Sequence, residues 1–106
     1  MSLSSEVALY LNRINEFKKN ARSRIRLYDD IFNEAISLLQ EDDIKATISR
    51  EEISDILSVW KLDIEGITRE ITNRELDTLT KDTEIRHVIG EIVVDTVKSH
   101  YDKLYS

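Results

Sequence analysis

The sequence predicts an all-α protein: an antiparallel three-helix bundle with a long N-terminal helix, or a four-helix bundle if the second helix breaks. Apolar residues recur at spacings of three and four along most of the chain, which is the period of an amphipathic helix. The 106 residues include no proline and two glycines, so few positions force a turn. Charged residues make up 34% of the chain, as expected where long helices expose a solvated face.

The N-terminal helix is predicted from the stretch between Glu6 and Leu39, which keeps one apolar face over five heptads. Positions a and d of these heptads hold Val7, Tyr10, Ile14, Phe17, Ala21, Arg24, Tyr28, Ile31, Ala35 and Leu38. Ser4 or Ser5 can cap the helix, which we extend to about Gln40. A helix of roughly 36 residues is a rod of about 54 Å, and that length suggests a coiled-coil-like partner.

Residues 41–49 are interpreted as a connector. The three acids at 41–43 oppose the dipole at a helix C-terminus, so the first helix should end there. Ile44, Ala46 and Ile48 alternate with polar residues, as in a strand, but the run is short and we do not predict a strand.

The second helix is predicted to begin at the capping box formed by Ser49 and Glu52. Its apolar face comprises Ile53, Ile56, Leu57, Trp60, Ile64, Ile67 and Ile71. It either continues to about Thr80 or breaks near Thr72, where a second capping box with Glu75 would start a fourth helix.

The last helix is predicted from a cap at Thr80 or Asp82. Residues 88–97 are rich in β-branched side chains, which also suit a strand. The spacing of Ile85, Ile89 and Ile92 favours a helix.

We expect residues 1–106 to form a single helical domain, with residues 1–4 disordered or an added leader. No apolar run reaches the roughly 18 residues that span a bilayer, and no signal peptide is recognisable. The chain has no cysteine, which excludes disulfides and cysteine-based zinc sites and fits a reducing compartment. A cytoplasmic protein is therefore expected.

No catalytic signature is recognisable, so we expect no enzyme, no cofactor and no metal. The spacing of Glu84 and His87 occurs in di-iron helical bundles, but those sites need a second such pair. Val97 stands three residues before the other histidine, His100, so the second pair is missing.

An exposed apolar patch is predicted at the far end of the first helix. In an up-down-up bundle the shorter third helix covers only the first two-thirds of that helix, and a bare apolar surface usually marks an interface. The interaction residues predicted on this patch are Tyr28, Ile31, Phe32, Leu38, Leu39, Ile53, Leu57 and Trp60. The alternative is that residues 41–49 fold back, so that Ile44 and Ile48 cover the patch.

A basic run between residues 18 and 26 supports the alternative function. Lys18, Lys19, Arg22 and Arg26 could grip nucleic-acid phosphates. They could equally form a solvated face on which Arg26 pairs with an acid at position 29 or 30. The net charge of −6 argues against nucleic-acid binding by the whole surface.

Arg24 occupies a core d position of the same helix. It either pairs with Glu65, Glu70 or Glu91, or extends outward beside the apolar seam. Taken together, the patterns predict a small non-enzymatic helical interaction module with a protein partner, most simply a homodimer. The alternative is a nucleic-acid-associated protein.

Overall fold

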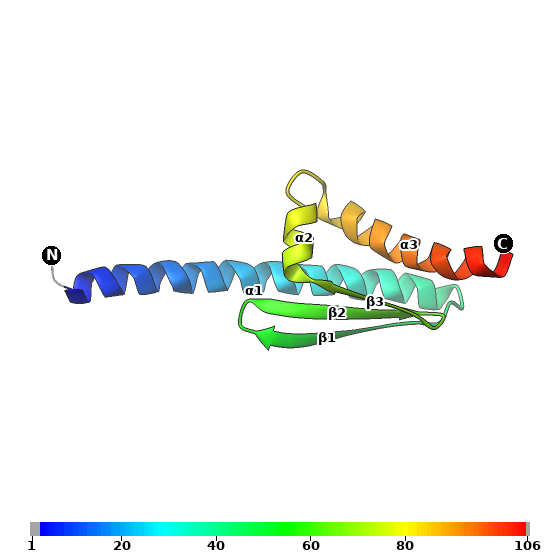
Figure 1. The fold of residues 1–106 in the computed structure, drawn as a ribbon, viewed down its shortest axis with the longest axis horizontal. Helices are drawn as coiled ribbons and strands as arrows, with labels where there is room; N and C mark the ends of the chain where they lie inside the picture. Colours follow the sequence, from blue (N-terminus) through cyan, green and yellow to red (C-terminus); the bar gives the residue numbers. More distant parts are fainter. Residues whose placement is uncertain (1–2, 106) are drawn as a thin grey trace.

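The computed structural model describes residues 3–105 and has a mixed α/β fold (Figure 1). Its elements, in chain order, are α1 (Leu3–Glu41), β1 (Ala46–Ser54), β2 (Leu57–Ile64), β3 (Ile67–Thr72), α2 (Asn73–Leu79) and α3 (Ile85–Tyr105). The strands form one antiparallel sheet in the order β1-β2-β3. α1 and α3 pack on one face of the sheet, and the short α2 lies beside α1. The predicted all-α bundle, with three or four helices, is therefore wrong.

The sheet occupies the segment that we expected to form the connector and most of the second helix. In β2, Trp60, Leu62 and Ile64 are buried while Lys61 between them is exposed. This alternation has the period of two that marks a strand with one buried face. The shorter alternation assigned to the connector likewise belongs to β1. The helical spacing seen in this segment combines apolar residues of three strands that turns separate, and only Trp60, Ile64 and Ile71 of the predicted face are buried.

A two-residue turn joins β2 to β3 where we expected a helix interior. Glu65 and Gly66 both have positive φ, at 52° and 86°. Positive φ at both positions is the geometry of the hairpin turn that matches strand twist, and glycine adopts it without a Cβ clash. The Gly66 amide donates to Asp63 Oδ1 at 3.2 Å, which fixes the turn.

Two local predictions are confirmed: α1 ends within one residue of the predicted end, and α3 is the predicted last helix. The predicted cap of that helix at Thr80 or Asp82 is wrong, because Thr80 ends α2 and α3 begins at Ile85 after Glu84. Of the two alternatives at Thr72, the break is the one observed. The second capping box forms: the Glu75 amide donates to Thr72 Oγ1 at 3.2 Å, and the Thr72 amide donates to Glu75 Oε1 at 3.4 Å. The first box does not form, because Ser49 lies inside β1. Of the expected leader, residues 1 and 2 lie outside the described residues, whereas residues 3 and 4 belong to α1.

Trp60 lies at the centre of the core. Its ring meets Tyr28 edge-on at a centroid distance of 6.0 Å and Phe32 at 5.6 Å, so the middle strand is packed directly against α1. Aromatic pairs in such arrangements stabilise the packing beyond their buried area. The other buried members of this core are Ile25, Ile31, Ile36, Ala46, Leu62, Ile64, Ile71, Leu76, Val88, Ile89, Ile92 and Val93.

The sheet covers only the C-terminal half of α1, because strands and helices differ in rise. The nine residues of β1 span about 30 Å at 3.3 Å per residue. About 20 helical residues at 1.5 Å each span the same distance. Counted back from the end of α1, this length reaches Arg22, where the β1–β2 turn meets the helix through Asp55. The rest of α1 extends beyond the sheet and beyond α3 (Figure 1).

Candidate interaction surface

The N-terminal part of α1 projects from the folded body. Residues 4–17 are all exposed except Ile14, which is half-buried. Figure 1 shows this blue end of the helix running past every other element, and the molecule is accordingly 68 Å long but only 26 Å and 21 Å across. We call residues 4–17 the projecting segment.

Large apolar side chains lie uncovered on the projecting segment. Val7 is 48% exposed, Tyr10 64%, Leu11 50% and Phe17 56%. Together with Ile14 they form what we call the projecting face. Single exposed apolar residues are common on proteins, but a contiguous group of this kind usually marks an interface.

The projecting face continues directly into the core face of the same helix. At 100° per residue, positions 7, 10, 14 and 17 point within about 40° of the direction of Ala21. The next residues along this line are Ile25, Tyr28 and Phe32, all buried in the core. α1 thus has one apolar stripe, of which the C-terminal half is covered and the N-terminal half is not.

The exposed patch predicted at the C-terminal end of α1 does not exist as one surface. We expected the other helices to cover the first two-thirds of α1, whereas the structure covers its C-terminal half and leaves the N-terminal part exposed. Tyr28, Ile31, Phe32 and Trp60 are buried in the core. Leu39 and Leu57 are half-buried, and only Leu38 and Ile53 are exposed, at 58% and 54%. The alternative arrangement is the one observed, since Ile44 and Ile48 pack against the core. The residues that are uncovered were within the predicted heptads, but sequence reasoning placed them under two other helices.

Two of the four candidate nucleic-acid residues are held in ion pairs. Lys18 Nζ lies 3.4 Å and Arg22 Nη2 lies 3.6 Å from Asp55 Oδ2, at the turn between β1 and β2. Lys19 and Arg26 are exposed, and Arg26 has no ion-pair partner within residues 3–105, so the predicted pairing with position 29 or 30 is absent. The positive charge of the basic run is therefore partly neutralised at its centre.

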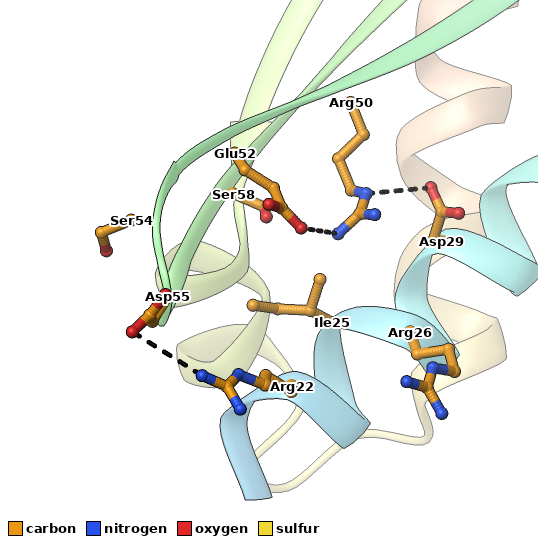
Figure 2. Close-up of a pocket in the computed structure, with 9 residues that line it drawn as sticks. All are labelled: Arg22, Ile25, Arg26, Asp29, Arg50, Glu52, Ser54, Asp55 and Ser58. Carbon is orange, nitrogen blue, oxygen red and sulfur yellow. Dashed lines mark ion pairs between the residues drawn. The ribbon is translucent and has the colours of Figure 1, made fainter. Parts of the chain in front are cut away.

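A polar pocket of about 200 Å³ lies between the basic run and the β1–β2 hairpin (Figure 2). Its lining contains three arginines and three carboxylates: Arg22, Arg26, Arg50, Asp29, Glu52 and Asp55. Arg50 lies between two of these acids, 3.8 Å from Asp29 and 3.5 Å from Glu52. Equal numbers of opposite charges make the pocket a poor site for a phosphate or another anion.

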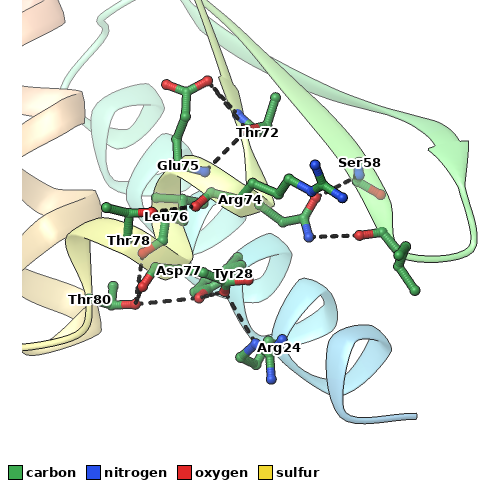
Figure 3. A network of polar contacts seen from close by, with 12 residues as sticks. Arg24, Tyr28, Ser58, Thr72, Arg74, Glu75, Leu76, Asp77, Thr78 and Thr80 are labelled. Carbon is green, nitrogen blue, oxygen red and sulfur yellow. Dashed lines mark hydrogen bonds and ion pairs between the residues drawn. The ribbon is translucent and has the colours of Figure 1, made fainter. Parts of the chain in front are cut away.

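Arg24 pairs with an acid that we did not predict. Its Nε lies 3.2 Å from Asp77 Oδ1 on α2, and its side chain remains 44% exposed (Figure 3). The Tyr28 hydroxyl donates to the same carboxylate oxygen. Burial, followed by this hydrogen bond, raises the pKa of Tyr28 above its usual 10.0. The Arg24 side chain therefore extends outward from the apolar stripe of α1 and connects α1 to α2.

The described part of the chain contains no cluster of three or more His, Cys, Asp or Glu residues that could hold a metal ion. Glu84 accepts a hydrogen bond from the His87 backbone amide at 3.0 Å, which makes it a cap for α3. His87 Nε2 lies 3.0 Å from Glu91 on the exposed side of that helix. Among residues 3–105, no helix is long and apolar enough to cross a membrane.

No protein-family model, curated protein or solved structure matches this chain.

Proposed function

We propose that this protein is a small non-enzymatic interaction module that associates with a second copy of itself through the projecting face. The observation that carries the proposal is the exposure of Val7, Tyr10, Leu11 and Phe17 on a helix whose continuation is buried. A cytoplasmic location, favoured by the absence of cysteine, belongs to the same proposal.

The low stability of a short unpacked helix supports the view that a partner molecule covers the projecting face. A helical segment of this length is marginally stable alone in water, since most helix stability in proteins comes from packing an amphipathic face. The projecting segment extends a stable helix, but among residues 3–105 four of the five members of its apolar face remain exposed. A second copy would supply that cover with the same apolar chemistry, as in two-fold dimers.

Nucleic-acid binding has weaker support. The single carboxylate of Asp55 pairs with both Lys18 and Arg22 and offsets one of their two positive charges, whereas Lys19 and Arg26 have no ion-pair partner within residues 3–105. Few phosphate contacts give weak and strongly salt-dependent binding.

Sedimentation equilibrium over a range of concentrations tests self-association. We expect a dimer for the natural sequence and a monomer for Phe17→Glu, because a charge would be buried in the interface. Leu9→Glu is the matched control, because Leu9 is 52% exposed on the same segment but lies off the projecting face. It should remain dimeric. A natural chain that is monomeric at high micromolar concentration would overturn the proposal, as would equal effects of the two substitutions.

A further inference from the structure

We infer that the two copies pair their projecting segments antiparallel, with the folded bodies at opposite ends of the shared helix pair. The inference rests on the proposed self-association and specifies its geometry. It follows from the position of the bodies relative to the apolar stripe of α1.

Parallel in-register pairing conflicts with the fold. Beyond residue 20 the apolar stripe is buried within each chain: Tyr28 packs against Trp60 of β2 and donates to Asp77 of α2, and Ala21 and Ile25 are only 2% and 4% exposed. A parallel partner helix lying on Val7 to Phe17 would continue into that occupied space. The partner's own sheet and α3 would also have to occupy it.

Antiparallel pairing avoids this conflict. The partner helix then lies along residues 7–17 in the opposite direction, on the part of α1 that extends beyond every other element (Figure 1). The two bodies lie on opposite sides of this paired segment. The whole projecting segment can be covered without displacing the sheet or α3.

The side chains of the projecting face also favour this orientation. If the two-fold axis passes residue 12, Tyr10 meets the partner's Ile14 and Val7 meets the partner's Phe17. Each layer then combines an aromatic with a β-branched side chain, and alternating sizes fill an interface evenly. Parallel pairing would instead stack like on like, with two aromatic layers and two aliphatic ones.

The charges on either side of the apolar stripe also favour antiparallel pairing. In a parallel pair, position g faces position e of the next heptad, which places Arg13 beside the partner's Lys18 on both sides. The antiparallel pair centred on residue 12 contains a single contact of this kind, between Arg13 and the partner's Arg13. Like-charge contacts are therefore fewer in the antiparallel arrangement.

Disulfide cross-linking can test the orientation, because the chain contains no cysteine. We would prepare Val7→Cys and Phe17→Cys separately and oxidise each alone and as an equal mixture. The antiparallel pair predicts that the mixture forms mainly a mixed covalent dimer on a non-reducing gel, several-fold more than either variant alone. A parallel pair predicts the reverse, with each variant cross-linking to itself.

Leu11→Cys provides a second test that leaves the central layers intact. Near an antiparallel two-fold axis, residue 11 lies beside the partner's residue 11, whereas in a parallel pair the two lie on opposite sides. Most of this variant should become a covalent dimer. Self-linking of Val7→Cys, or a dimer by sedimentation that cross-links at none of these positions, would overturn the antiparallel geometry. A monomeric natural chain would overturn self-association itself.

Discussion

The indole Nε1 of Trp60 donates a hydrogen bond to Asp29 Oδ1 at 3.0 Å and thereby joins the middle strand to α1. Trp60 is fully buried, and Asp29 is the acceptor that its indole N–H uses. Asp29→Ala should lower the free energy of unfolding by about 1–3 kcal/mol, because it leaves a buried donor unsatisfied. Urea denaturation measures the change.

Asp30→Ala is the control for that substitution. Asp30 is exposed, and its side chain has no hydrogen-bond or ion-pair partner within residues 3–105. Its replacement should change the stability by no more than about 0.5 kcal/mol. Equal losses for the two variants would show that Asp29 acts through general charge and not through Trp60.

Tyr28 gives the fold a specific sensitivity to alkali. Its pKa is raised in the folded state, so its contribution to stability is fully present below the unfolded value near 10 and is lost as pH rises through the folded pKa. Deprotonation removes the hydrogen bond to Asp77 and places a phenolate beside a carboxylate. Denaturation at pH values from 9 to 11 should show a fall in stability above pH 10 that is smaller in Tyr28→Phe. The same slope in both proteins would contradict this role.

The two glycines should respond to alanine with opposite signs. Apart from the adjacent residues and the helix's own backbone, no atom lies within 4 Å of a Cβ added at either position, so backbone conformation decides. Gly66→Ala places a side chain at φ +86° in the β2–β3 turn and should destabilise the protein by about 1 kcal/mol or more. Gly90→Ala, inside α3, should stabilise it by about 0.5–1 kcal/mol. Thermal unfolding of both variants tests this, and a gain at Gly66 would contradict the turn.

Two substitutions at Thr72 should measure how much the capping box of α2 contributes to the stability of the protein. Thr72→Ala removes the oxygen that accepts the Glu75 amide and should cost about 1 kcal/mol, whereas Thr72→Ser keeps that oxygen and should cost much less. Ser49→Ala should have little effect, because Ser49 lies in β1 and caps no helix. A larger loss at Ser49 than at Thr72 would contradict this assignment. Denaturant midpoints suffice for all three comparisons.

Local signals in the sequence predicted the elements that local interactions determine. The apolar period of α1, the helical spacing of Ile85, Ile89 and Ile92 in α3, and the capping box at Thr72 all appear as expected. Each depends on residues within a few positions of one another, because helix geometry and caps are set by neighbours in the chain.

The sheet could not be derived in the same way. Ile64, Ile67 and Ile71 fit a helix by spacing, yet Ile64 and Ile67 are paired residues of adjacent strands on either side of a turn. Gly66 was the local signal for the turn, since a glycine between short alternating runs is a hairpin signal, but we placed it inside the predicted second helix. Strand pairing is decided by contacts between residues on opposite sides of the turn. The spacing of apolar residues along the chain gives no information about those contacts.

The sequence by itself determined that α1 carries one continuous apolar stripe, because side-chain direction along a helix follows from its period. Only the tertiary structure decided which half of that stripe is covered. The outcome depends on how far the returning chain reaches, and with strands of about 30 Å the β1–β2 turn reaches Arg22 and Lys18 through Asp55. The residues left beyond that point, from Val7 to Phe17, are the surface on which the proposed association depends.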